Sequence, residues 1–256
     1  MSEESTPVHI ASCSFGKDSL AAILVRLEHG EPVDAALYCR IMFDDDISAE
    51  YPEHDEWIHT YAIPLLKSRY GIETHIAQAT GEYDTYCKLF YRTRGATAKW
   101  KGVIYGFPLM TGSWCNSKLK VRSLKVAESA FEEPKIILGI AVDEPKRIPR
   151  AVKKGQVLPL VDYGITEAQA FDICRKADLL SPAYISGGGK QRLGCWFCHK
   201  QRIGEYRKLR AYYPQLWQKL LALDKDNPPG VGFTKVDTVH NLDDRFANEE
   251  AQYALF

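Results

Sequence analysis

Polar and small residues crowd a turn that follows the first apolar run of the chain. The segment SCSFGKDSLAA, residues 12–22, comes directly after VHIA and leads into an amphipathic stretch. The first N–H groups of a helix have no partner within it, and the helix dipole places partial positive charge there, so such a turn can hold a phosphate group. Gly16 would let the anion approach the backbone, and Lys17 would add a positive charge. Ser14 and Ser19 would add hydroxyl groups.

Two common phosphate-binding motifs do not fit this turn. The P-loop pattern GxxxxGK[ST] needs a glycine five residues before Gly16, where the chain has Ala11, and the pattern GxGxxG is absent. A simpler interpretation is a helix that follows a strand and is capped by Asp18 or Ser19. The spacing alone does not decide between a phosphate-binding turn and a simple capped helix.

The elements that would position this turn alternate between strand and helix patterns. Over residues 8–80, short apolar runs alternate with longer stretches whose apolar residues have helical spacing. Such alternation favours parallel strands joined by right-handed crossovers, with ligands at the carboxyl ends of the strands. The expected strands are VHIASCS, DAALYCRIMF and IETHIAQA, and the expected helices are DSLAAILVRLEHG and YPEHDEWIHTYAI, the second broken or kinked at Pro64.

The rest of the chain contributes one more strand and several helices. Residues 83–133 indicate helix and loop, KIILGIAV predicts a buried strand over 135–142, and VLPLVDYG predicts a short strand or extended piece. Helices are expected at ITEAQAFDICRKADL, in GEYRKLRAYYPQLWQKLLALDK, which Pro214 would divide, and in the C-terminal tail. We therefore predict an α/β protein with a Rossmann-like parallel sheet flanked by helices. Its nucleotide-binding domain would span residues 1–165, and a helical C-terminal region would span residues 166–256.

The overall composition is that of an ordinary globular protein. The chain has 256 residues, of which 45% are hydrophobic and 26% charged, and it is long enough for a buried core. Its 33 Lys and Arg residues balance 33 Asp and Glu residues, so the whole-chain charge gives no reason to expect binding to nucleic acid or to a membrane. It shows neither a secretory leader pattern nor a run of about 18 apolar residues, so we expect a cytoplasmic protein without membrane contact.

Several segments, in the same order along the chain, resemble the motifs of one superfamily. SFGKDS resembles the PP-loop, SxGxDS, of the adenine nucleotide alpha hydrolases, which include ATP pyrophosphatases, tRNA thiolation enzymes and phosphoadenosine phosphosulfate (PAPS) reductases. YPEHDEWI, WCNSKLKVRSL, LGIAVDEPKRI, VLPLVDYGITEAQAFDIC and RLGCWFCHKQ are similar to further blocks of the PAPS reductase-like family. The resemblance is greatest to the subset of phages and mobile elements and to the ATP-pyrophosphatase component of DNA phosphorothioation systems.

This resemblance implies an enzyme that binds ATP or a related adenine nucleotide. The expected activity is that of an ATP pyrophosphatase, in which an acceptor oxygen attacks the α-phosphate, an adenylylated substrate forms and pyrophosphate leaves, with Mg²⁺ and the loop stabilising charge. Sulfur transfer to the activated acceptor would follow, a nucleic acid being one candidate. Two alternatives are open: a sulfonucleotide reductase acting on PAPS or adenosine phosphosulfate, and a nucleotide-binding module without catalysis. True PAPS reductases carry a catalytic cysteine near the C-terminus, whereas this chain has none after Cys198, which argues against the reductase.

The same motifs assign roles to particular residues. Those expected to be catalytic are Lys17, Asp18 and Ser19. Those expected to contact the nucleotide are Ser12, Ser14, Phe15, Gly16, Lys17, Asp18, Ser19, Asp44, Lys118, Glu144 and Arg147.

Some of these residues also fit a plainer interpretation. Asp44 follows the second strand, where its carboxylate would meet the ribose or Mg²⁺, but it also fits a solvated acidic turn. Glu144 and Arg147 follow the fourth strand and would align the leaving pyrophosphate, or they form a surface ion pair.

Cys195 and Cys198 form a CxxC pair within GCWFCHK. Such a pair can ligate a metal, exchange electrons or be two buried thiols. A metal needs further ligands, so we take Cys115 as the third and consider His199, Cys174 or a non-protein group as the fourth. The resemblance implies a [4Fe-4S] cluster, with Zn²⁺ as the alternative. Related phosphorothioation proteins have a fourth cysteine shortly after the pair, which this chain lacks.

Basic residues gather in two segments in the middle of the chain. One is CNSKLKVRS, with Lys118, Lys120 and Arg122, and the other contains Arg92, Arg94, Lys99 and Lys101 with Tyr91 and Trp100 among them. Either segment could bind phosphates or single-stranded nucleic acid, or form a solvated face. The partners we consider are therefore an adenine nucleotide, a nucleic acid substrate and a second copy of the chain in a homodimer.

Overall fold

The computed structural model describes residues 7–95 and 100–253, which belong to two compact units. The first unit comprises Met1–Arg40, Pro52–Gln78 and Arg122–Tyr184, and the second comprises Ile41–Tyr51, Ala79–Val121 and Ile185–Phe256. This division differs from the boundary expected after residue 165. The first unit extends to Tyr184, and two earlier segments of the chain belong to the second unit.

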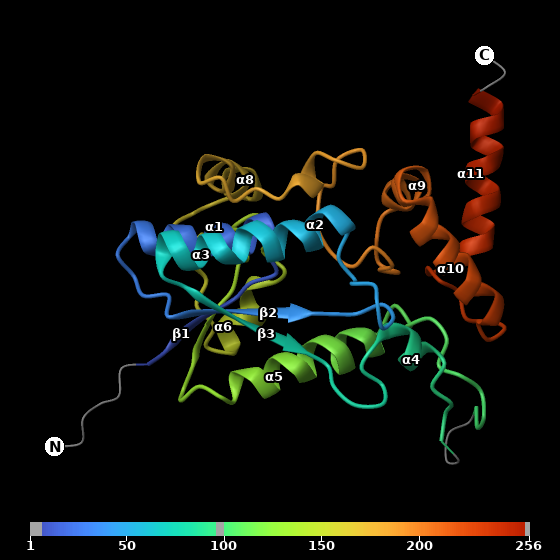
Figure 1. Ribbon diagram of the computed structural model, residues 1–256, viewed down its shortest axis with the longest axis horizontal. Helices are drawn as coiled ribbons and strands as arrows, with labels where there is room; N and C mark the ends of the chain where they lie inside the picture. Colours follow the sequence, from blue (N-terminus) through green and yellow to red (C-terminus); the bar gives the residue numbers. More distant parts are fainter. Residues whose placement is uncertain (1–6, 96–99, 254–256) are drawn as a thin grey trace. The chain divides into compact units, whose positions relative to one another are not determined.

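The first unit is built on a four-stranded sheet in which all neighbouring strands are parallel (Figure 1). The strands β1 (His9–Ser12), β2 (Ala35–Arg40), β3 (Glu73–Gln78) and β4 (Lys135–Ile137) are arranged in the order β3-β2-β1-β4. From β1 the chain proceeds to β2 and β3 on one side and later returns to β4 on the other side. The carboxyl ends of β1 and β4 therefore lie next to each other at a topological switch point, where open α/β sheets bind ligands.

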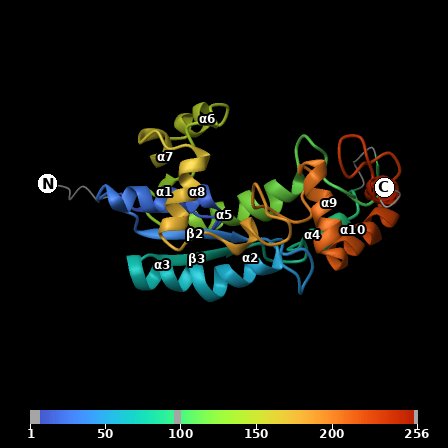
Figure 2. The ribbon, with the colours of Figure 1, turned by 90° about the horizontal axis from the view of Figure 1, so that it is seen from above.

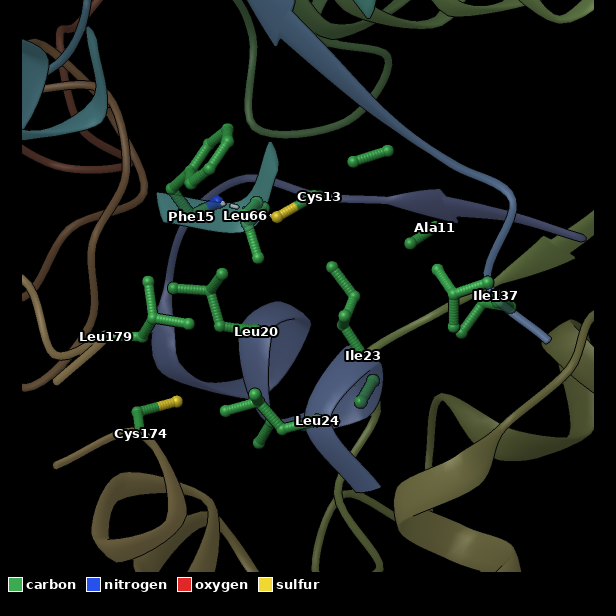
Figure 3. Packing of buried hydrophobic residues seen from close by; sticks show 14 of the residues in the cluster. Ala11, Cys13, Phe15, Leu20, Ile23, Leu24, Leu66, Ile137, Cys174 and Leu179 are labelled. Carbon is green, nitrogen blue, oxygen red and sulfur yellow. Dashed lines mark hydrogen bonds between the residues drawn. The ribbon is translucent and has the colours of Figure 1, made fainter. Parts of the chain in front are cut away.

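Helices pack against both faces of this sheet, which confirms the predicted α/β class. Successive strand residues point to opposite faces. One face packs on α1 (Lys17–Glu28) and α3 (Ile63–Tyr70), and the other packs on α5 (Arg122–Glu128) (Figures 1 and 3). The buried strand residues of the first face are Ala11, Ala36, Tyr38 and Ile137, with Cys13 directly after β1, and those of the second face are Ile10, Leu37 and Ala77.

Helix α1 forms as its apolar spacing predicts. Leu20, Ile23 and Leu24 are buried against the sheet, and Leu27 packs at the edge of the same cluster (Figure 3). The helix ends at Glu28, and Gly30 follows it with a φ of 68°, which is favourable for glycine, and with its N–H donating to the carbonyl of Leu27. The position of the polar turn before α1 is therefore set by a well-packed strand and helix.

The first unit contains further helical segments, of which those over residues 52–62 and 167–176 were predicted and the others were not. They are α2 (Pro52–Trp57), the π-helical segment η1 (Ile58–Ala62), α6 (Ile148–Lys153), α7 (Pro159–Asp162), α8 (Glu167–Lys176) and the 3-10 turn η3 (Pro182–Tyr184). The break or kink expected at Pro64 takes the form of the π-helical segment η1. The chain therefore stays helical, with the longer-range hydrogen bonds of a π-helix just before the proline. Helix α8 starts with a capping box between Thr166 and Gln169, and Figure 2 shows it beside α1.

The region after α5 differs from the expectation in two places. The predicted strand over 135–142 is shorter, because β4 ends at Ile137. In the expected short strand or extended piece VLPLVDYG, Val157 forms a parallel bridge with Ile137, but Pro159–Asp162 form α7, with Pro159 in its first turn. The strand ends early because the chain leaves the sheet to pass against the start of α1. At Gly139, a Cβ atom would overlap the carbonyl of Asp18 and lie 2.5 Å from the nitrogen of Ser19.

The second unit is mainly helical and has an aromatic core. Its helices are α4 (Tyr86–Phe90), the π-helical segment η2 (Asn116–Val121), α9 (Ile203–Tyr212), α10 (Pro214–Asp226) and α11 (Val239–Tyr253). Pro214 separates α9 from α10 as predicted, and the last helix is present. The largest buried side chains of this core include Phe43, Tyr86, Trp196, Tyr206 and Trp217. The helical C-terminal region expected from the sequence is therefore confirmed.

We predict that Gly139→Ala lowers the free energy of unfolding by about 1–3 kcal/mol, because the new methyl group would overlap the peptide between Asp18 and Ser19. Urea unfolding followed by circular dichroism measures the change. Gly204→Ala is the matched control, because a Cβ atom at Gly204 has no neighbour within 4 Å. Equal stability of the two variants would contradict the close approach at Gly139.

Candidate functional site

The turn between β1 and α1 is held in a strained conformation by a buried aromatic ring. Phe15 has a φ of 57°, which a bulky residue rarely adopts and which occurs most often at functional sites. Its ring is fully buried and meets the ring of Tyr38 edge-on, with 5.3 Å between the centroids. Packing of the ring thus offsets the backbone strain and fixes the turn in place.

Ser19 closes the turn with its side chain. Its hydroxyl accepts a hydrogen bond from the N–H of Ser14 at 3.2 Å and donates to the carbonyl of Gly16 at 2.9 Å. The side chain of Ser14 is exposed, and its oxygen lies 3.5 Å from that of Ser19. Ser19 is therefore mainly structural in this state, whereas Ser14 presents a hydroxyl to solvent.

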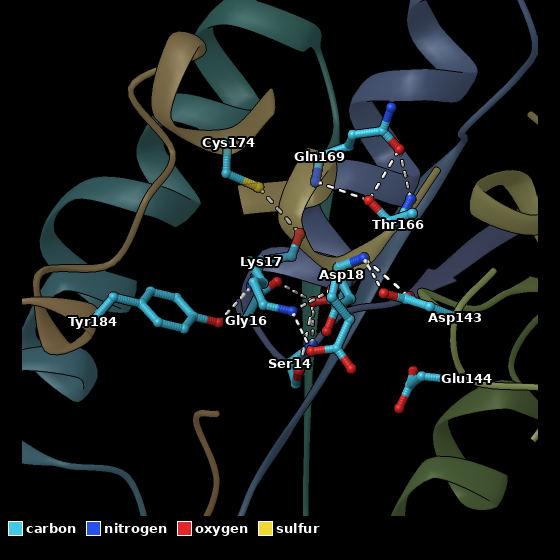
Figure 4. A network of polar contacts seen from close by, with 12 residues as sticks. Ser14, Gly16, Lys17, Asp18, Asp143, Glu144, Thr166, Gln169, Cys174 and Tyr184 are labelled. Carbon is cyan, nitrogen blue, oxygen red and sulfur yellow. Dashed lines mark hydrogen bonds and ion pairs between the residues drawn. The ribbon is translucent and has the colours of Figure 1, made fainter. Parts of the chain in front are cut away.

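The start of α1 leaves backbone donors without acceptors. The first helical bond runs from the N–H of Leu20 to the carbonyl of Gly16, and the N–H of Lys17 donates to the hydroxyl of Tyr184 at 2.8 Å (Figure 4). Within the described part of the chain, the N–H groups of Asp18 and Ser19 have no hydrogen-bond partner. These donors and the helix dipole favour an anion at this end of the helix.

The ammonium group of Lys17 is buried and paired with two carboxylates. It lies 2.7 Å from Oδ1 of Asp18 and 3.0 Å from Oε2 of Glu167, the first residue of α8 (Figure 4). The carboxylate of Asp143 accepts the N–H of Glu167 at 3.1 Å, which holds the start of α8 in place. The positive charge of the turn is thus neutralised inside the protein.

Further carboxylates surround this ion pair. Burial raises the pKa of Asp18, and the charges of Glu167 and Glu144 raise it further, while Lys17 acts in the opposite direction. Glu144 is itself paired with Arg147 at 2.5 Å. Because carboxylates outnumber cations here, a bound anion would be stabilised by backbone N–H groups, hydroxyls and any cation or proton that accompanies it.

A buried histidine supports the turn from the side of α2. The Nδ1 atom of His54 lies 2.8 Å from the hydroxyl of Ser181, and the backbone of Ser14 is a further hydrogen-bond partner of the ring. Burial lowers the pKa of His54 to about 4, and the neighbouring Asp55 opposes this shift. The imidazole is therefore neutral at pH 7, and it links the turn to the segment that carries Tyr184.

Within the first unit, the structure brings several of the predicted site residues together. The turn residues from Ser12 to Ser19 lie at the end of β1, with Glu144 close to Asp18 and Arg147 bound to Glu144. The other two predicted nucleotide contacts, Asp44 and Lys118, belong to the second unit.

The carboxylate of Asp44 already has several partners within the second unit. It pairs with Lys219 at 3.0 Å and accepts the N–H groups of Asp46 and Ile47. Burial raises the pKa of Asp44, but these contacts outweigh burial and the pKa is lowered. Asp44 therefore stabilises its own acidic turn, and its contact with a nucleotide stays a prediction.

The three cysteines expected to bind metal all lie in the second unit. Burial raises the pKa of Cys115, Cys195 and Cys198. The charge of a Cys198 thiolate raises the pKa of Cys115 and of Cys195 further. The thiols are thus close enough to interact and are protonated at neutral pH. Among residues 7–95 and 100–253, however, no three His, Cys, Asp or Glu side chains are grouped so that they could hold a metal ion. The described side chains around these thiols therefore do not form a metal site.

The two side chains considered as a fourth ligand have other partners. Nε2 of His199 lies 3.1 Å from the hydroxyl of Ser113, and burial lowers its pKa to about 4. The thiol of Cys174 donates to the carbonyl of Lys17 at 3.1 Å, within the first unit. His199 and Cys174 therefore have structural contacts of their own.

The described part of the predicted basic and aromatic segment folds back on itself without forming a named strand. Thr93 pairs with Ile104 in an antiparallel bridge. The guanidinium groups of this segment stack on tyrosine rings, Arg92 at 4.5 Å from the centroid of Tyr83 and Arg94 at 5.4 Å from that of Tyr105. Trp100 and Lys101 are exposed, and Lys99 lies outside the described residues. Nucleic acid binding by this segment stays a prediction.

Sequence reasoning missed three residues that contact the turn, namely His54, Glu167 and Tyr184. Glu167 and Tyr184 are 150 and 167 positions away from Lys17 along the chain. The capping box at Thr166 predicts that Glu167 begins a helix, but nothing local indicates which group it meets. Such contacts arise only from the way α8 and η3 pack on α1.

Comparison with known proteins gives little functional information. No family model matches the chain. It is 24% identical over 225 residues to an uncharacterized protein of Methanocaldococcus jannaschii. The match covers 83% of this chain and 40% of that protein, so the chain spans less than half the length of its relative. In the described residues, no helix is both long and apolar enough to cross a membrane.

We predict that the protein loses stability as the pH falls from about 6.5 to 4, because the unfolded chain protonates His54 before the folded chain does. The contribution of this histidine is complete above pH 6.5 and decreases by about 1.4 kcal/mol per pH unit below it. Urea unfolding at a series of pH values measures the slope. His54→Gln should reduce the slope, with the exposed His75→Gln as control. An unchanged slope in His54→Gln would contradict a buried neutral His54.

Proposed function

We propose that the first unit binds ATP or a related adenine nucleotide through its phosphates and that the protein is an ATP pyrophosphatase which adenylylates an acceptor. The observation that carries the proposal is the turn at the end of β1. It lies at the switch point of a parallel sheet, where the unpaired N–H groups of Asp18 and Ser19 begin a twelve-residue helix. The resemblance to PP-loop proteins supports an adenine nucleotide as the ligand.

The residues of the turn have distinct roles in this proposal. The N–H groups of Asp18 and Ser19 and the hydroxyl of Ser14 would contact phosphate oxygens, because within the described residues these N–H groups have no partner and this hydroxyl is exposed. The positive charge of Lys17 would attract the phosphates from a short distance, while its ion pair with Glu167 holds the start of α1 against the start of α8. Mg²⁺ bound to the nucleotide would compensate the carboxylates around Asp18, and it would enter with the substrate.

The proposed reaction needs little covalent participation by the protein. An acceptor oxygen attacks the α-phosphorus of ATP, the bond from that phosphorus to the oxygen bridging the α- and β-phosphates breaks, and pyrophosphate leaves while the acceptor hydroxyl loses its proton. The turn would stabilise the charge that moves to the leaving pyrophosphate. We propose that the reaction takes place in the cytoplasm, with sulfur transfer to a nucleic acid as a candidate second step.

The first experiment tests nucleotide binding and turnover together. We expect the protein to bind MgATP in calorimetry and to release pyrophosphate and AMP, or an adenylylated acceptor, from labelled ATP. Ser14→Ala should weaken ATP binding by roughly tenfold, because a hydrogen bond to a charged group is lost, without a change in folding stability, since the Ser14 side chain is exposed. Ser129→Ala, at another exposed serine of the first unit, is the matched control.

The outcomes separate the proposal from its alternatives. Binding of ATP without pyrophosphate release would indicate a nucleotide-binding module. Release of sulfite from PAPS or adenosine phosphosulfate would indicate a sulfonucleotide reductase. Absence of any nucleotide binding by a folded protein would overturn the proposal.

The cysteine site is tested by metal analysis. The resemblance predicts a [4Fe-4S] cluster, or Zn²⁺, on Cys115, Cys195 and Cys198, although the described side chains do not form a metal site. If the prediction holds, protein purified without oxygen contains iron and acid-labile sulfide, or zinc, and Cys198→Ser loses it while Cys87→Ser retains it. A wild-type protein without iron or zinc would contradict it and leave the three cysteines with a structural role.

A further inference from the structure

Tyr184 places a hydroxyl group next to the start of α1. Its oxygen accepts the N–H of Lys17 at 2.8 Å. A Cβ atom on Gly16 would lie 3.5 Å from this oxygen and 3.5 Å from the oxygen of Ser14. The hydroxyls of Tyr184 and Ser14 therefore flank the open side of Gly16, where the turn has no side chain (Figure 4).

The surroundings of Tyr184 keep this hydroxyl protonated. Burial raises its pKa, and the nearby charges of Asp18 and Glu167 act in the same direction, against the hydrogen bond from Lys17. The group is thus an O–H donor at neutral pH. Among the described residues, no hydrogen bond takes up its proton.

Several contacts fix the ring in this position. The ring meets that of Phe171 edge-on, with 5.7 Å between the centroids. The N–H of Tyr184 donates to the carbonyl of Ser181, and the hydroxyl of Ser181 lies 2.8 Å from the ring of His54, which also contacts the backbone of Ser14. The segment that carries Tyr184 is therefore tied to the same turn at two points.

We propose that Tyr184 is a direct ligand of the bound nucleotide: its oxygen keeps the hydrogen bond from Lys17 while its O–H donates to a phosphate oxygen held beside Gly16 and Ser14. This inference rests on the proposed function of the turn and adds a residue that lies outside the turn. A phenolic donor suits this place because it adds no charge to a site already rich in carboxylates. The N–H of Lys17 polarises the hydroxyl and strengthens it as a donor.

The test compares Tyr184→Phe with Tyr163→Phe by calorimetry, using MgATP, inorganic pyrophosphate and adenosine as ligands. Tyr163 is the matched control, because its hydroxyl also makes a hydrogen bond within the first unit, to Glu31. We expect Tyr184→Phe to weaken the binding of ATP and of pyrophosphate by about tenfold or more, because one hydrogen bond to a charged group is removed. The affinity for adenosine should stay unchanged. Tyr163→Phe should bind all three ligands as the wild type does.

The outcomes distinguish this inference from the proposed function. If the wild type binds ATP and Tyr184→Phe binds it equally well, the inference fails and the proposed function stands. Tighter binding by Tyr184→Phe would also overturn it, because the tyrosine would then occupy the place of the phosphate. Absence of ATP binding by the wild type would overturn both the inference and the proposed function. Tyr184→His, which keeps a ring donor and acceptor, should retain more affinity than Tyr184→Phe, and circular dichroism checks that both variants are folded.

Discussion

The left-handed backbone of Phe15 is the constraint on which the site depends. A bulky residue takes this conformation only where its surroundings hold it, and here the surroundings are the sheet and Tyr38, on which the ring packs. With Phe15 turned into the core, the N–H groups of Asp18 and Ser19 remain at the open end of α1. The same packing that stabilises the first unit therefore determines which backbone donors stay available.

Backbone dipoles and hydroxyls, more than free charge, define this site. Lys17 would be the obvious phosphate ligand, yet its buried ammonium group is paired with Asp18 and Glu167, and a phosphate could recruit it only by breaking these ion pairs. The lysine thus joins α8 to α1 and holds the turn. An anion bound as we propose would be stabilised by fixed groups that need no rearrangement when the ligand arrives.

The local parts of the site could be predicted from the sequence, and the distant parts could not. The strand, the turn and the apolar face of α1 follow from spacing over residues 8–27. The early end of β4 could not be predicted, because the pattern KIILGIAV is typical of a buried strand. The strand stops where Gly139 approaches the backbone at the start of α1, which is a tertiary contact. His54, Glu167 and Tyr184 reach the turn through tertiary packing, which leaves no periodic signal in the chain.

The cysteines of the second unit illustrate the same limit in another form. Their spacing indicates metal or redox chemistry, but burial raises the pKa of each thiol, and a protonated thiol is a poor nucleophile and a poor ligand. Lys120 and Lys200 lower the pKa of Cys198, although less than burial raises it. Any metal bound here would have to displace protons from these partly buried thiols, so its affinity would increase with pH. The chemistry of these thiols is therefore determined by their burial as much as by the spacing that the sequence shows.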